Sequence, residues 1–123
     1  MAHIVVLGAG VGGIPTAYEL HKVKRPEDRI TVISSADSFQ FTPSNPWVAV
    51  RWRKPEEIKV AMGPVFARLG IDFIAKAAQR VHPEANEVEL ADGQKVAYDF
   101  LVIATGPRLA FDEVEGLGPQ GYT

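Results

Sequence analysis

A glycine-rich turn near the start of the chain constrains the fold more than any other feature. Residues 8–13 read Gly-Ala-Gly-Val-Gly-Gly, which contains the spacing G-x-G-x-x-G. The turn follows an apolar, β-branched run at residues 3–7, typical of a strand buried on both faces. Apolar residues then recur at spacings of three and four over residues 14–21, which predicts a helix with one buried face.

A second β-rich run at residues 29–33 completes a β-α-β unit, in which the two strands are expected to be parallel neighbours. In this context the glycines have separate roles: a tight turn, close approach of a pyrophosphate to the backbone, and packing of the helix on the strand. The sequence therefore predicts a dinucleotide-binding turn, with a glycine-rich turn without ligand as the alternative. The predicted binding residues are Gly8, Gly10, Val11, Gly12 and Gly13.

The end of the second strand lacks the acidic residue that usually binds the ribose hydroxyls of a dinucleotide. The strand ends in Ser34 and Ser35. Either serine could bond a ribose, and Asp37 could reach it from the loop, but an ordinary turn-forming serine pair is an equal alternative. The missing carboxylate weakens an NAD site more than an FAD site.

The middle of the chain is predicted to add a long loop, a helix and a strand. Residues 34–53 lack periodicity and exceed usual loop lengths, which favours a functional loop. Pro55 with Glu56 and Glu57 predicts a helix start, interrupted at residues 63–64 and capped by Gly70. Residues 71–75 form a third strand candidate.

Short β-rich runs at residues 77–82, 87–90 and 95–97, separated by turn residues, predict a β-meander. The apolar run at residues 98–106 then returns to the parallel sheet. The expected fold is α/β: a Rossmann-like FAD-binding domain with a parallel sheet, helices and a small antiparallel meander. Residues 1–110 are expected to be the N-terminal part of this FAD/NAD(P)-binding domain, and residues 111–123 a linker toward a downstream domain.

Composition excludes several classes of function. Lysine and arginine number 13 against 15 acidic residues, so a net charge of −2 gives no reason to expect nucleic acid binding. No apolar run is long enough to span a bilayer, and the chain is expected to be cytoplasmic. There is no cysteine, and the three histidines are scattered, so no metal site is predicted.

Two further segments resemble one flavoprotein family. The strand that closes on Ala104-Thr105-Gly106 resembles the segment near the flavin in glutathione-reductase-like flavoproteins. The loop Phe39-Gln40-Phe41-Thr42-Pro43-Ser44-Asn45-Pro46-Trp47, with Lys54-Pro55-Glu56-Glu57-Ile58, is similar to the sulfide:quinone oxidoreductases. By this resemblance Pro43, Ser44, Asn45, Thr105 and Gly106 would be flavin neighbours, and the adenine contact would fall at Ala77 and Ala78.

The resemblance implies an FAD enzyme that passes electrons from sulfide to a membrane quinone. In that family the reactive cysteines would lie outside this chain, so no catalytic residue is assigned here and the chain alone is expected to be inactive. The full-length protein would be a peripheral membrane protein. The alternatives are an NAD(P)H-dependent flavoprotein such as a type II NADH:quinone dehydrogenase, and a stand-alone nucleotide-binding module.

Aromatic and basic residues are mixed in the long loop. Phe39, Phe41, Trp47 and Trp52 lie among Arg51, Arg53 and Lys54. A quinone channel or a membrane edge is one interpretation of this mixture. Core packing of the aromatic side chains is the expectation.

Overall fold

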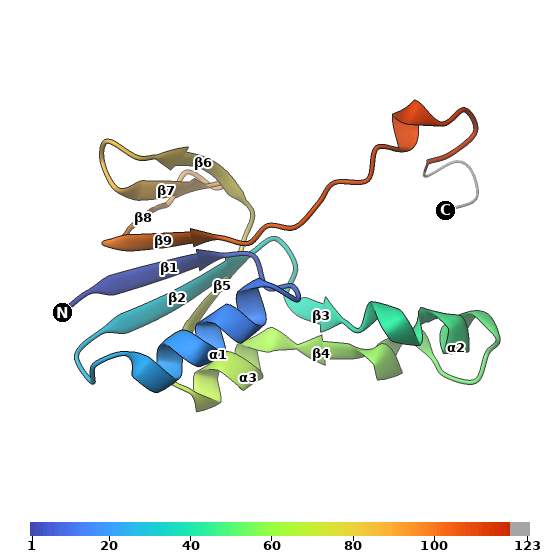
Figure 1. Cartoon of the computed structure of the whole chain (residues 1–123), viewed down its shortest axis with the longest axis horizontal. Coiled ribbons are helices and arrows are strands. Elements are labelled where there is room, and N and C mark those ends of the chain that lie inside the picture. Colours follow the sequence, from blue (N-terminus) through green and yellow to red (C-terminus); the bar gives the residue numbers. More distant parts are fainter. Residues whose placement is uncertain (119–123) are drawn as a thin grey trace.

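A parallel sheet lies at the centre of the fold (Figure 1). The structure, a computed structural model, describes residues 1–118 of the 123. The strands run in the order β5-β2-β1-β9, and their bounds are β1 His3–Leu7, β2 Arg29–Ser34, β5 Asp72–Ala75 and β9 Phe100–Ile103. Helix α1 (Gly13–Val23) connects β1 to its parallel neighbour β2, which confirms the predicted β-α-β unit.

Helices cover one face of the sheet and the meander covers the other, because side chains of successive strand residues point to opposite faces. Val6 packs against α1 and α3 (Met62–Arg68) in a core that includes the fully buried Phe66. Val5 and Leu7 pack against the meander, whose strands are β6 Ala78–His82, β7 Glu87–Leu90 and β8 Lys95–Ala97. The predicted Rossmann-like fold with an antiparallel meander is confirmed.

A separate antiparallel ribbon extends from the sheet, to the right in Figure 1. Strand β3 (Ser38–Gln40) pairs with β4 (Lys59–Ala61). The segment between them contains short helices: the 3₁₀ turn η1 (Thr42–Ser44), the helix α2 (Asn45–Ala49) and the 3₁₀ turn η2 (Pro55–Ile58). We call residues 38–61 the arm.

The arm corrects two expectations. The segment at residues 34–53 is not a structureless loop, since it contains β3, η1 and α2. The prediction of a helix that begins at Pro55 was wrong. After one 3₁₀ turn the chain continues as β4, because residues 59–61 pair with β3. Helix α3 begins only at Met62, so Gly63 and Pro64 lie in its first turn. Backbone N–H groups there have no acceptor within the helix, so proline, which lacks an N–H, costs no hydrogen bond. Gly70 follows this helix with φ +63°, as predicted for a cap.

After β9 the described chain leaves the sheet with one 3₁₀ turn, η3 (Phe111–Glu113). The predicted linker at residues 111–123 stays a prediction, and its last five residues lie outside the described part. None of the helices within residues 1–118 is both long and apolar enough to cross a membrane.

The amino edge of the sheet carries a histidine in an environment that disfavours its charge. His3 is partly buried on β1, and its Nε2 lies 2.7 Å from the hydroxyl of Thr31. Burial lowers the pKa of His3 below its ordinary value, and the guanidinium of Arg29 adds to this effect, although Asp72 and Asp99 oppose it. The folded chain therefore favours a neutral imidazole.

This lowered pKa predicts a loss of stability in mild acid. As the pH falls below about 6.5, the unfolded chain binds a proton at His3 that the folded chain resists, so the free energy of unfolding should decrease. The His3→Gln variant should lose less stability over the same range. Urea unfolding at about pH 8 and about pH 5 gives the loss in the free energy of unfolding for the parent chain and for the variant. An equal loss of stability in the two proteins would contradict the assignment of this pH dependence to His3.

Candidate functional site

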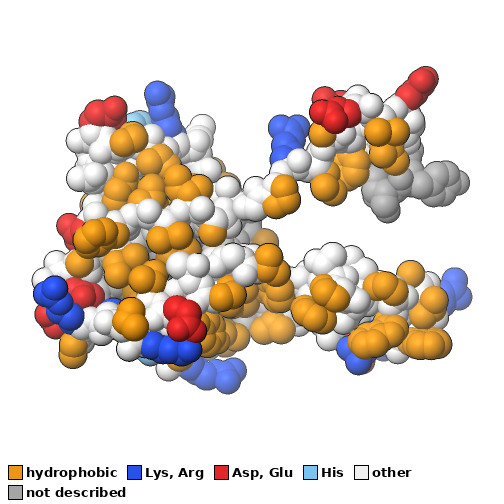
Figure 2. Space-filling view, in the orientation of Figure 1, with side chains coloured by type: hydrophobic (Ala, Val, Ile, Leu, Met, Phe, Trp, Pro, Cys, Tyr) orange, Lys and Arg blue, Asp and Glu red, His pale blue; other side chains and the backbone are white. Residues whose placement is uncertain are grey.

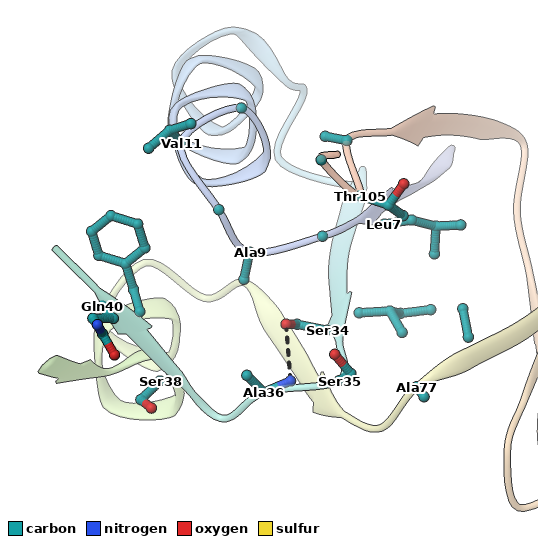
Figure 3. A pocket seen from close by; sticks show the side chains of 18 of the residues that line it. Leu7, Ala9, Val11, Ser34, Ser35, Ala36, Ser38, Gln40, Ala77 and Thr105 are labelled. Atoms are coloured by element: carbon teal, nitrogen blue, oxygen red, sulfur yellow. Dashed lines mark hydrogen bonds between the residues drawn. The ribbon is translucent and has the colours of Figure 1, made fainter. Parts of the chain in front are cut away.

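A cavity of about 820 Å³ opens at the carboxyl edge of the parallel sheet (Figure 3). It lies between the turn after β1, the ends of β2 and β9, the first residues of β6 and the base of the arm. Ligands of open α/β sheets bind outside the carboxyl ends of the strands. The volume is in the range of small-molecule and cofactor sites.

Close backbone contacts build the wall of this cavity. Gly8 has φ +105°, and a Cβ atom placed on it would lie 2.1 Å from the carbonyl oxygen of Ala104. A Cβ on Gly13 would lie 1.8 Å from the carbonyl oxygen of Gly8. Glycine at these two positions therefore lets α1 rest on the turn and lets the turn rest on the end of β9.

Gly10 serves a different purpose, because no heavy atom lies within 4 Å of a Cβ placed on it. It faces the cavity. Within residues 1–118, the backbone N–H groups of Gly10, Val11 and Gly12 have no hydrogen-bond acceptor in the protein. Gly12 is also the N-cap of α1, without a side-chain cap. These free donors at a helix N-terminus suit a diphosphate group.

The end of β2 offers hydroxyl groups in place of a carboxylate. Ser34 and Ser35 both line the cavity, and the Ser34 hydroxyl accepts a hydrogen bond of 3.3 Å from the N–H of Ala36 (Figure 3). Ser34 therefore forms the local turn contact that the sequence analysis gave as the alternative to ribose binding. Asp37 is not among the lining residues, and its carbonyl accepts a hydrogen bond from Met62. Among the described residues, no charged side chain lines the cavity.

The structure gathers most of the predicted site residues around this cavity. The turn, both serines, the start of the meander and the end of β9 meet there. The predicted residues that line it are Gly8, Gly10, Val11, Gly12, Ser34, Ser35, Ala77, Ala78, Thr105 and Gly106.

Four predicted residues do not line the cavity. Gly13 packs against the turn, as described above. Pro43, Ser44 and Asn45 lie farther along the arm, where Ser44 is buried and the Asn45 side chain accepts a 3.0 Å hydrogen bond from Gln40. The lining instead includes arm residues that sequence reasoning did not select, namely Ser38, Phe39, Gln40 and Thr42. Phe39, Gln40 and Thr42 had one signal, membership of the motif at residues 39–47, and Ser38 had none.

The core-packing expectation for the loop aromatics was wrong for three of the four side chains. Phe39 is partly buried against the helix-side core. Phe41, Trp47 and Trp52 are 52%, 42% and 78% exposed. Among residues 1–118 no group of three or more metal-ligating side chains gathers into a site.

Comparison with known proteins gives consistent similarities. The model of the family named pyridine nucleotide-disulphide oxidoreductase matches residues 2–123. The sulfide-quinone reductase of Aquifex aeolicus is 48% identical over 109 residues, which cover 89% of this chain and 25% of that protein. Subunit epsilon of the NADH-dependent phenylglyoxylate dehydrogenase of Aromatoleum evansii is 32% identical, over 86% of this chain and 25% of that protein.

Solved structures agree in fold. The crystal structure of the sulfide:quinone oxidoreductase from Aquifex aeolicus superposes with a TM-score of 0.84 at 47% identity, over 90% of this chain and 26% of that one. NDH2 from Plasmodium falciparum, at 22% identity and a TM-score of 0.74, shares the fold. The chain spans about a quarter of the length of the relatives that it matches.

Proposed function

Because the chain belongs to the pyridine nucleotide-disulphide oxidoreductase family, we propose that it is the FAD-binding part of an enzyme that oxidises sulfide and reduces a quinone. The observation that carries this proposal is the 48% identity to the sulfide-quinone reductase of Aquifex aeolicus over 89% of the chain. The cavity supports it, since its glycine turn presents free N–H groups where a diphosphate would lie.

The chain's own residues divide the work of binding FAD along the cavity. The N–H groups of residues 10–12 would hold the diphosphate. Ser34 and Ser35 would bond the ribose with hydroxyl groups, and Ala77 and Ala78 would flank the adenine. Thr105 and Gly106, which follow β9, would meet the flavin ring. Pro43, Ser44 and Asn45 of the arm do not line the cavity and are proposed as flavin neighbours from the family resemblance alone.

FAD would supply the redox chemistry, and this chain would bind and orient it. In the proposed reaction sulfide gives up two electrons, and a quinone takes up two electrons and two protons to become a quinol. This chain contains no cysteine, so the reactive cysteines of the proposed enzyme would have to come from other segments. The chain alone is expected to be inactive, and the complete enzyme is proposed to be a peripheral membrane protein with sulfide and a membrane quinone as substrates.

An anaerobic visible spectrum of the complete polypeptide that carries this chain tests the proposal. Bound flavin should bleach when sulfide is added, and a quinone should restore the spectrum. A polypeptide purified without flavin, and unable to take it up, would overturn the FAD assignment. Flavin that sulfide leaves oxidised would overturn the sulfide assignment.

The same experiment separates the principal alternative. A relative named as an NADH-dependent dehydrogenase subunit is 32% identical over 86% of the chain, which favours NADH as the second candidate donor. Bleaching by NADH and not by sulfide would transfer the protein to the NAD(P)H-dependent flavoproteins.

A further inference from the structure

The outer end of the arm exposes large apolar side chains that no part of the described chain covers. We call residues 46–54 the arm tip. Trp47, Val50 and Trp52 are all exposed, and at 78% Trp52 is the most exposed aromatic side chain among residues 1–118. Figure 2 shows hydrophobic and basic side chains together at this end of the molecule. Exposed apolar groups gathered at one projecting point indicate an interaction surface.

The charge of the arm tip differs from that of the whole chain. The tip carries Arg51, Arg53 and Lys54 and no acidic residue, whereas the complete chain has a net charge of −2. Within residues 1–118 none of these three side chains forms an ion pair. The nearby carboxylate of Glu57 accepts a 2.6 Å hydrogen bond from the backbone N–H of Lys54. The tip is therefore a locally cationic surface.

A capped turn holds the tip in shape. Several backbone hydrogen bonds close the end of helix α2. The N–H groups of Trp52 and Arg53 both donate to the carbonyl of Trp47, at 2.8 and 3.2 Å, and the N–H of Arg51 donates to the carbonyl of Val48 at 3.0 Å. Arg51 has φ +62° in this turn, a conformation in which glycine is the usual residue. The chain thus keeps an arginine at a position where its backbone is strained.

Arginine and tryptophan are also stacked at the tip. The guanidinium of Arg53 lies 4.2 Å from the centre of the Trp47 ring. This cation–π contact fixes a positive charge against an indole that is itself 42% exposed. Indole rings beside guanidinium and ammonium groups match the boundary of a bilayer, where apolar atoms enter the acyl region and charges meet lipid phosphates.

We propose that the arm tip docks onto a bilayer surface that carries anionic headgroups. Trp47 and Trp52 enter the interface, while Arg51, Arg53 and Lys54 contact lipid phosphates. The proposal rests on the proposed function in one respect: it needs a membrane that holds the quinone. The tip directly follows residues 43–45, which are proposed flavin neighbours, so docking brings the flavin end of the site to the surface from which a quinone arrives.

Intrinsic fluorescence reports on this docking directly, because the only two tryptophans of the chain, Trp47 and Trp52, both lie in the tip. The full chain is titrated with phosphatidylcholine vesicles that contain phosphatidylglycerol, without FAD or sulfide. The emission should shift to shorter wavelength, and the chain should sediment with the vesicles. Vesicles of phosphatidylcholine alone should produce a much weaker response, and added salt should release the chain.

Three variants test the residues. Each basic residue near an anionic surface contributes about fivefold in affinity, so neutralising Arg51, Arg53 and Lys54 together should weaken binding about 100-fold. Arg51→Gly removes one charge at a position where glycine relieves the strained φ, so it should weaken binding about fivefold while raising the urea midpoint. Arg68→Gln, which removes an exposed charge in α3 outside the tip, should bind like the parent chain.

Two results would overturn the proposal. One is an unchanged emission spectrum with phosphatidylglycerol vesicles, whether or not the complete enzyme proves to contain a sulfide-reducible flavin. The other is a concentration-dependent spectral shift without vesicles that Trp52→Ala abolishes, because a second copy of the chain would then be the occupant. Since neither readout uses flavin or sulfide, failure of the docking proposal is distinct from failure of the proposed function.

Discussion

Replacing Gly13 with alanine is expected to destabilise the chain by about 3 kcal/mol or more, a large share of the 5–15 kcal/mol typical of a domain. The added Cβ would lie 1.8 Å from the carbonyl oxygen and 2.8 Å from the carbonyl carbon of Gly8. Both are backbone atoms of the turn, so no side chain can rotate away to relieve the overlap. Helix α1 must move off β1, and Val6 and Ala17 then lose their packing in the helix-side core.

Gly12→Ala is the matched control for this prediction. A Cβ on Gly12 would lie 3.7 Å from the Cβ of Ala104, an ordinary contact, and the backbone there has φ −92°. The free energy of unfolding of this variant should lie within about 0.5 kcal/mol of that of the parent chain. Urea titrations followed by far-UV circular dichroism give both free energies. If the two alanine variants were equally stable, the helix would not be resting on the turn as the structure describes.

Replacing Gly10 with alanine should have the opposite outcome: an intact fold and a loss of FAD binding. No heavy atom lies within 4 Å of the added Cβ, so the protein can accept it. The methyl group would occupy the cavity beside the free N–H groups of residues 10–12, where the diphosphate is proposed to bind. Hydrogen bonds to a charged group contribute about 1.5–3 kcal/mol each, so displacing the diphosphate should weaken FAD binding about 100-fold.

FAD binding is best measured by flavin absorbance and fluorescence titration of the complete polypeptide, with thermal unfolding recorded for the same samples. Gly63→Ala is the control, because Gly63 lies in α3 and a Cβ there would meet only the Phe73 ring at 4.0 Å. That variant should bind FAD like the parent. Unchanged FAD affinity in Gly10→Ala would refute the position proposed for the diphosphate.

The sheet and its layers could be predicted because their signals are local. The run at residues 3–7, the glycine turn and the helical spacing that follows are contiguous, and the β-α-β crossover fixes how they pack. The meander strands are separated by short turns, so each pairs with its sequence neighbour. The return of β9 to the parallel sheet could be predicted from its fully apolar sequence, but its place beside β1 could not.

The arm could not be predicted because its pairing is not local. Strands β3 and β4 have three residues each and pair across the intervening segment, too few residues for an alternating pattern to emerge. The Pro55-Glu56-Glu57 signal does start a helical turn, but pairing of residues 59–61 with β3 ends it. Tertiary contacts therefore decided the structure where local propensity had indicated a helix.

The candidate site was predictable to the extent that it depends on strand ends. The carboxyl ends of β1, β2 and β9 meet at one edge, so the glycine turn, Ser34 and Thr105 had to lie near one another. Gln40 and Thr42 were missed because their place depends on the direction in which the arm leaves the sheet. The exposure of Trp47 and Trp52 was missed for the same reason, since aromatic composition alone does not reveal whether a segment packs on the core.

The pairing of β1 with β9 has a consequence for synthesis of the protein. Val5 pairs with Leu101, so strands that are far apart in the sequence lie side by side. While the ribosome is still making the intervening residues, β1 has β2 on one side and an open edge on the other. Such distant pairing raises contact order and slows folding. Because Gly106 lines the cavity, the nascent chain has no finished pocket for a nucleotide until that residue has emerged from the exit tunnel, so cofactor binding follows synthesis of β9.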